Sequence, residues 1–211
     1  MIARVVTKFV ANMWLAIALL HAQKLSDAER KFFERADDAL GVHLGAVIAD
    51  IGTGSTFMHP LRIAEKVGTS GKVICVDVRS EAIANIKEQA ESHHLTNIEA
   101  ILGKEDDPLL TAETFDGILV SHTYHEFTQP SAMLRHMYDA LKTGGGLVVL
   151  EFYSKTDRSE SRADQARWHH MSPDILEREL STAGFVIKER IQAVPPNGGA
   201  VQYFIRAEKS K

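Results

Sequence analysis

Apolar residues between Leu25 and Leu40 recur at the spacing of one helical face, at positions 25, 28, 32, 33, 36, 39 and 40. This period predicts an amphipathic helix, and Gly41 readily adopts the left-handed conformation in which helices end. The next apolar run, Ala46–Ala49, has the length of a strand and contains no polar residue. It predicts a strand buried on both faces that ends at Asp50.

Short apolar runs and helical patterns alternate through the middle of the chain. The runs of strand length are Lys72–Val76, Ile98–Leu102, Gly117–Val120 and Leu147–Leu150, and the helical segments are Ala82–Ser92 and Ser131–Leu141. Such alternation predicts an α/β fold with a mainly parallel sheet covered by helices. Three consecutive glycines at 144–146 indicate a turn before the fifth strand.

The C-terminal part departs from this alternation. Ser172 followed by Pro173 predicts the start of a helix, which Gly184 ends. Two runs of strand length follow, Phe185–Gln192 and Val201–Ala207, and the Pro- and Gly-rich segment between them is typical of a hairpin. A hairpin joins antiparallel strands, so we expect the sheet to end with an antiparallel strand.

The N-terminal residues 1–23 stand apart from the single domain predicted for residues 24–211. Arg4 and Lys8 precede an apolar run, Phe9–Leu20, in an order that resembles a signal peptide. The run is shorter than the roughly twenty residues of an ordinary membrane span. Two hypotheses remain: export or membrane contact through residues 1–22, or a helix packed on the domain. The second, with a cytoplasmic location, is slightly favoured.

Composition narrows the choice of partner. The 211 residues are 45% apolar and 25% charged, which is ordinary for one globular domain. A formal net charge of -4 and the lack of a basic patch argue against a nucleic-acid partner. Cys75 is the single cysteine and has no partner for an internal disulfide. Nothing in the sequence indicates an oligomeric state.

A glycine-containing loop follows the first strand and predicts a ligand site. Asp50-Ile51-Gly52-Thr53-Gly54-Ser55-Thr56 joins the buried strand to a helix, and its glycines let the backbone approach a ligand. Asp77 ends the next strand, where a carboxylate can bind both ribose hydroxyls. Phe57 stands where a dinucleotide loop needs its third glycine, and no phosphate-binding P-loop pattern is present. A nucleoside without phosphates remains, and S-adenosylmethionine fits.

The chain resembles the class I S-adenosylmethionine-dependent methyltransferases, within them the ubiquinone-methyltransferase-like and predicted small-molecule enzymes. The matching stretches, in the family's order, are VIADIGTGS, GKVICVDV, NIEAILGKEDDP, FDGILVSHTYHEF and MLRHMYDALKTGGGLVVLEF. The resemblance implies a Rossmann-like seven-stranded sheet, mainly parallel with an antiparallel last strand and helices on both faces. It also implies S-adenosylmethionine as cofactor and methyl transfer to an acceptor, for which the compact length favours a small molecule.

The resemblance assigns cofactor roles residue by residue. Asp50, Gly52, Thr53 and Gly54 line the methionine moiety, and Asp77 binds ribose. The chain departs from the family pattern at Thr56, where a third glycine is common, and at Lys104, where an aspartate commonly reaches the adenine amino group. We expect Glu105 or the backbone around it to take that role beside Lys104, with Val78 as an apolar wall for adenine.

The segment after the fourth strand is the candidate acceptor side, because acceptors meet the cofactor at the carboxyl edge of such sheets. His125 could remove an acceptor proton, with Glu126 orienting its ring. Tyr124 is a further catalytic candidate, while Ser121 and His122 are expected against the cofactor. Alternatively, these side chains only close the pocket.

The histidine pairs at 93–94 and 169–170 could join His122, His125 and Glu126 in a metal site, but no tight helical His or Cys/His ligand pattern is present, so no metal site is predicted. Trp168 would cover an aromatic acceptor or pack beneath a loop. Two rival hypotheses remain for the whole chain. One is a non-catalytic protein that binds S-adenosylmethionine, suggested by Thr56 and Lys104. The other is an NAD-binding oxidoreductase, which Phe57 and the terminal hairpin disfavour.

Overall fold

The computed structural model describes residues 27–154, 160–193 and 200–210. The chain divides into two compact units, residues 1–34 and residues 35–211, and the second contains every described strand. The predicted N-terminal segment and the glycines of the predicted hairpin turn lie outside the described residues. Within the described residues, no helix combines the length and apolarity that a membrane span requires.

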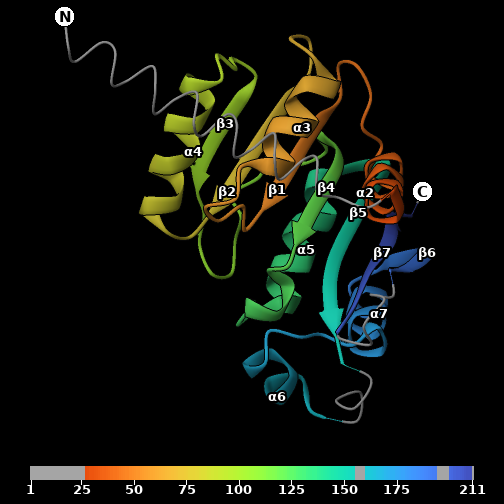
Figure 1. Cartoon of the computed structure of the whole chain (residues 1–211). Coiled ribbons are helices and arrows are strands. Elements are labelled where there is room, and N and C mark those ends of the chain that lie inside the picture. Colours follow the sequence, from red (N-terminus) through yellow and green to blue (C-terminus); the bar gives the residue numbers. More distant parts are fainter. Residues whose placement is uncertain (1–26, 155–159, 194–199, 211) are drawn as a thin grey trace, which may run out of the picture. The chain divides into compact units, whose positions relative to one another are not determined.

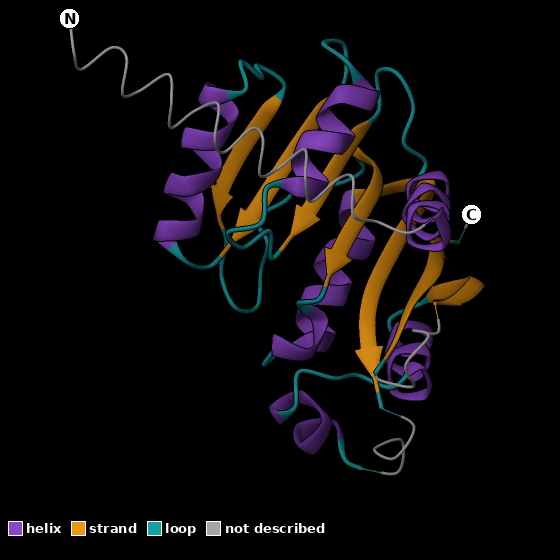
Figure 2. Cartoon of the chain, in the orientation of Figure 1, coloured by secondary structure: helices purple, strands orange, loops and turns teal. Residues whose placement is uncertain are grey.

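Seven strands form one sheet in the order β3-β2-β1-β4-β5-β7-β6. Their bounds are β1 Val47–Ile51, β2 Lys72–Asp77, β3 Ile98–Leu102, β4 Phe115–Ser121, β5 Leu141–Tyr153, β6 Phe185–Ala193 and β7 Val201–Lys209. Strands β1 to β5 pair in parallel, and β7 pairs antiparallel with both β5 and β6. The predicted fold class, with its antiparallel last strand, is confirmed (Figure 2).

The helices cover both faces of this sheet. They are α2 Asp27–Leu40, α3 Met58–Val67, α4 Ser80–Ser92, α5 Pro130–Ala140, α6 Arg162–Arg167 and α7 Pro173–Thr182, with a 3-10 turn, η1, at Tyr124–Glu126. From β1 the chain winds outward through β2 to β3, and from β4 it winds the other way (Figure 1). Right-handed crossovers therefore place α3 and α4 on one face and α5 on the other, where α7 contacts it.

The strand order reverses between β1 and β4, which lie side by side. In open α/β sheets the crevice for a ligand lies outside the carboxyl ends of the strands at such a point. Gly117 helps to hold β4 there, because a Cβ at this position would lie 2.1 Å from the carbonyl oxygen of Leu40. The end of α2 can therefore approach the strand closely.

The boundary between α5 and β5 differs from the prediction. Leu141 begins β5 and does not end α5, and the strand continues through the three glycines to Tyr153. The pairing of β4 with β5 shifts register between Phe115 and Gly117, and Gly144 has a φ of +80°. An irregular strand start therefore replaces the predicted turn, because glycine satisfies both conformations.

The predicted bounds of α7 are confirmed at both ends, but the expected cap is not formed by a side chain. The helix begins at Pro173, and Gly184 beyond its end has a φ of +95°. The buried Ser172 hydroxyl has no hydrogen-bond partner, whereas its backbone N–H donates to Oε1 of Gln165 at 2.6 Å. Gln165 thus positions the residue before the helix.

Candidate functional site

The loop after β1 is fixed to the neighbouring strands through its backbone. The N–H groups of Gly52 and Thr53 both donate to the carbonyl of Val76 in β2, at 2.7 and 3.2 Å. On its other side, the Thr123 hydroxyl donates to the Gly52 carbonyl at 3.0 Å. Gly52 has a φ of +71°, and a Cβ there would lie within 3 Å of three Thr123 atoms. This position requires glycine for its conformation and for the close approach of the segment after β4.

Asp77 faces the second glycine of the loop. Its carboxylate accepts hydrogen bonds from the N–H of Gly54 at 2.9 Å and from the N–H and Nε of Arg79 at 2.9 and 3.2 Å. Burial raises the pKa of Asp77, but these hydrogen bonds outweigh it and hold the pKa below its usual value. An ionised carboxylate beside a glycine loop suits the hydroxyls of a ribose.

Asp50 is a buried carboxyl group with a shifted pKa. It is 3% exposed, and burial raises its pKa to about 7, against the opposing effects of a hydrogen bond from Thr53 and the charge of Arg62. The Thr53 hydroxyl also donates to the Asp50 carbonyl at 2.9 Å. A cation at this place would favour the ionised form, and the ammonium group of an amino acid would supply one.

Sequence reasoning assigned no role to His59, which the structure places behind the crevice. Arg62 donates to Nδ1 of His59 at 3.1 Å, so Nε2 carries the proton and donates to the hydroxyl of Ser121 at 3.2 Å. Burial lowers the pKa of His59 to about 3, so the ring stays neutral. Ser121 is thereby held at the end of β4, where it was predicted to meet the cofactor.

The predicted adenine side contains exposed apolar groups. Val78 and Leu102 follow or end the neighbouring strands β2 and β3, and their side chains are 54% and 51% exposed. The N–H of Lys104 donates to the carbonyl of Asp107 at 2.8 Å in a turn beyond them. Glu105 accepts from the Thr128 hydroxyl at 3.3 Å, which directs it toward the segment after η1. The roles of Lys104 and Glu105 toward adenine stay predictions.

His125 is oriented by Glu151, not by Glu126 as the sequence suggested. Both its backbone N–H and its Nδ1 lie close to Oε1 of Glu151, at 3.1 and 3.0 Å, whereas Glu126 lies 3.9 Å from Nε2. Burial lowers the pKa of His125, but the hydrogen bond and charge of Glu151 outweigh it and raise the pKa above its usual value. Because Glu151 is fully buried at β5, it fixes the ring firmly.

Tyr124 does not agree with its predicted catalytic role. Its side chain is fully buried within the hydrophobic core cluster, and its hydroxyl donates to Oε2 of Glu179 at 2.7 Å. Burial and the nearby Glu179 charge raise its pKa further above the ordinary range. We assign Tyr124 to the packing of η1, because an aromatic residue there anchors the turn that carries His125.

The side chain of His122 contacts residues of β5 and β7. Its ring stacks on Phe152 with centroids 4.4 Å apart, and Gln202 donates to its Nε2 at 3.0 Å. Burial lowers the pKa of His122. Its expected contact with the cofactor stays a prediction.

The sequence placed His169 over the pocket but gave it no catalytic role, and its Nδ1 lies 3.2 Å from Nε2 of His125. Glu151 could have been found, because it ends an apolar run at the carboxyl edge as Asp50 and Asp77 do. His169 had no such signal, since it follows the short helix α6 far along the chain.

Comparison with known proteins places this geometry in context. Residues 43–190 match a family described as "Methyltransferase domain". A curated relative, the ubiquinone/menaquinone biosynthesis C-methyltransferase UbiE of Escherichia fergusonii, is 30% identical over 139 residues, which make up 65% of this chain and 55% of that protein. The chain thus spans about half the length of the curated relatives it matches.

Solved structures share the fold at lower identity. A SAM-dependent methyltransferase from Aquifex aeolicus aligns with a TM-score of 0.69 at 24% identity, covering 82% of this chain and 87% of that one. The [4+2]-cyclase SpnF aligns with a TM-score of 0.72 at 15% identity, covering 84% of this chain and 79% of its own. One fold here carries two different reactions, so the chemistry of this chain has to be argued from its site.

Proposed function

This chain belongs to the methyltransferase-domain family, and from that premise we propose that it transfers the methyl group of S-adenosylmethionine to a small-molecule acceptor. The observation that carries the proposal is the hydrogen bond from the N–H of Gly54, in the loop after β1, to Oδ2 of Asp77 at the end of β2, at 2.9 Å. This hydrogen bond links the glycine loop, which can admit a ligand, with a carboxylate that can bind the hydroxyls of a ribose.

Different residues of the chain would bind the different parts of the cofactor. Asp77 binds the ribose hydroxyls, and the ionised form of Asp50 attracts the ammonium group of the methionine moiety. Val78 and Leu102, both half exposed, supply apolar surface for adenine. Phe57 stands where a dinucleotide loop needs its third glycine, which favours this nucleoside over NAD.

Methyl transfer needs alignment more than chemical assistance. A lone pair or ring carbon of the acceptor forms a bond to the methyl carbon. The sulfonium sulfur takes the electrons of the breaking bond and leaves as the neutral thioether of S-adenosylhomocysteine. The acceptor's proton passes to water at the carboxyl edge of the sheet, where Glu151 holds the ring of His125 through Nδ1 at 3.0 Å.

The name of the curated relative, a ubiquinone/menaquinone biosynthesis C-methyltransferase, suggests the first acceptors to test. Hydroxylated aromatic rings are one such class, because loss of the hydroxyl proton makes a neighbouring ring carbon a better nucleophile. Trp168, with its side chain 67% exposed near His169, offers an aromatic surface to a flat acceptor.

Calorimetric titration of the full chain tests the cofactor assignment. We expect S-adenosylmethionine and S-adenosylhomocysteine to bind and NAD not to bind. Asp77→Asn should abolish binding of both sulfur nucleosides, whereas the matched surface variant Glu99→Gln should bind as the wild type does. Binding of NAD alone would make the protein an oxidoreductase candidate. Nucleoside binding without methylation of any acceptor would favour the non-catalytic hypothesis.

A further inference from the structure

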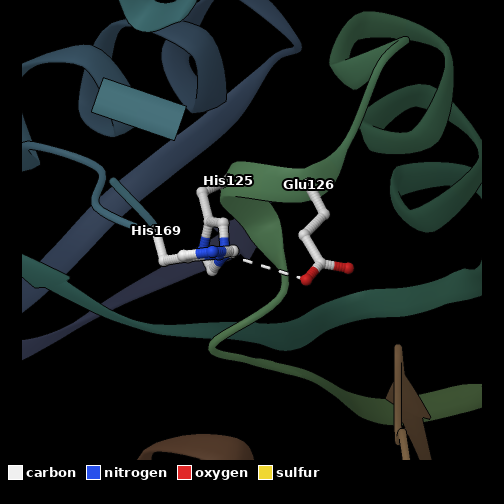
Figure 3. A group of neighbouring side chains, drawn as sticks. All are labelled: His125, Glu126 and His169. Carbon is white, nitrogen blue, oxygen red and sulfur yellow. Dashed lines mark hydrogen bonds and ion pairs between the residues drawn. The ribbon is translucent and has the colours of Figure 1, made fainter. Parts of the chain in front are cut away.

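Three side chains with metal-binding atoms converge at the acceptor side of the site. They are His125 and Glu126 of η1 and His169 of the turn after α6 (Figure 3). One ligand atom from each residue lies within 4.8 Å of the other two. Two separate parts of the chain, 44 residues apart, therefore direct side chains to one point.

The ring of His125 is held as a metal-bound histidine would be. Its Nδ1 lies 3.0 and 3.1 Å from the two oxygens of the fully buried Glu151. An ionised carboxylate only accepts hydrogen bonds, so Nδ1 carries a proton and Nε2 is the ring atom left to bind an ion. A carboxylate behind a histidine in this way fixes the tautomer and strengthens the ligand.

The spacing of the nitrogen atoms agrees with a shared ion. Nε2 of His125 and Nδ1 of His169 are 3.2 Å apart. Two nitrogens at about 2.0–2.1 Å from a tetrahedral zinc ion are roughly 3.3 Å apart, so the rings need little movement. Oε1 of Glu126 is 3.9 Å from Nε2 of His125, and its exposed side chain can close the remaining distance by rotation.

We propose that His125, His169 and Glu126 bind a divalent metal ion, with Zn²⁺ preferred. Two imidazoles and one carboxylate form a ligand set that leaves the fourth position of a tetrahedral ion open. The sequence predicted no metal, because these residues form no tight helical His or Cys/His ligand pattern. Glu126 and Glu151 both supply negative charge that favours a cation here.

The open position gives the ion a role, which rests on the proposed methyl transfer. A hydroxyl oxygen of the acceptor would bind there and lose its proton to water more readily, because the ion stabilises the oxyanion. The three proposed ligands are connected to the cofactor loop, since the hydroxyl of Thr123, two residues before His125, donates to the carbonyl of Gly52 at 3.0 Å. Metal binding itself does not depend on that role.

Metal titration of the chelator-treated full chain tests the site. We expect one equivalent of Zn²⁺ by calorimetry, and Co²⁺ should give the absorption bands of a tetrahedral ion. His169→Ala and Glu126→Gln should weaken binding by at least about tenfold. The matched control is His94→Ala, because His94 is also an exposed histidine with positive φ, 56° against 55° at His169.

The outcomes separate this proposal from the function proposed above. The metal-site proposal would be wrong if His169→Ala bound Zn²⁺ as tightly as the wild type does, or if the wild type bound no Zn²⁺. His125 and His169 would then be two histidines that share a proton. All four proteins should bind S-adenosylhomocysteine equally, which shows that the variants are folded. Metal binding without any nucleoside binding would contradict the methyltransferase proposal but support the metal site.

Discussion

At the scale of single residues, the buried Asp50 makes stability depend on pH. Its pKa is about 7 in the folded chain, against the model-compound value of 3.8. Between these values the folded state holds a proton that the unfolded state has lost. Raising the pH therefore favours unfolding, by up to about 1.4 kcal/mol per pH unit, and the effect levels off above pH 7.

Asp50→Asn removes this titration and gives the test. Urea unfolding from pH 5 to pH 8 should show the wild type losing stability relative to Asp50→Asn as the pH rises. Both proteins share every other titrating group, so the difference between their unfolding free energies isolates Asp50. Asp50 would be ionised in the folded chain if the difference stayed constant across this range, or if the wild type gained stability relative to Asp50→Asn as the pH rises.

The same residue scale shows where sequence reasoning succeeds. Asp50 and Asp77 could be predicted because each lies at the carboxyl end of a buried strand, and a strand end fixes the place of its side chain. His169 was expected over the pocket, but its contact with His125 could not be predicted, since that contact depends on how α6 packs beside η1. Glu126 was expected to orient His125 because it is adjacent in sequence, whereas Glu151, on another strand, contacts Nδ1 at 3.0 Å, and this contact depends on tertiary packing.

At the scale of elements, Asn97 connects α3 to the start of β3. Its buried Nδ2 donates to the carbonyls of Ala64 and Gly68, both at 2.9 Å, at the C-terminal end of the helix. Asn97→Ala leaves these carbonyls without that donor and should lower the unfolding free energy by about 1–3 kcal/mol. Asn97→Asp should cost more, because a carboxylate would face two carbonyl oxygens.

Thermal denaturation measures this prediction, with Asn85→Ala as the matched control. Asn85 is exposed and makes a longer hydrogen bond, 3.3 Å, to the carbonyl of Ser55. Its loss should change stability little. Equal melting temperatures for the two alanine variants would show that Asn97 does not support α3. Asn97→Ala should bind the nucleoside as the wild type does, because Asn97 lies at the amino-terminal edge of the parallel strands, opposite the edge proposed to bind the ligand.

Elements were predicted best where one physical cause sets their bounds. The period of the apolar residues placed β3 correctly at both ends, from Ile98 to Leu102. It failed for β5, because glycine is compatible with a turn and with the start of an irregular strand. Which of the two forms depends on the register with β4, and that is set by tertiary pairing.

At the scale of the whole molecule, topology brings together loops that the sequence separates. Alternation of strands and helices predicted the parallel sheet, and the terminal hairpin predicted its antiparallel end. The order of the strands did not follow from either. It depends on which way the chain turns after β3, and the reversal between β1 and β4 creates the crevice.

Hydrogen–deuterium exchange of the full chain can test this arrangement with S-adenosylhomocysteine as the ligand. Parallel strands place the loops at 52–57, 78–79, 103–107 and 121–126 at one edge of the sheet, and the loops at 41–46, 68–71 and 93–97 at the other. A nucleoside spanning β1, β2 and β3 should slow exchange in the first set together, because it orders backbone that water otherwise reaches. The second set should exchange as in the free protein. Protection confined to one loop would mean that the ligand does not span the strand ends, and protection at the opposite edge would place it elsewhere.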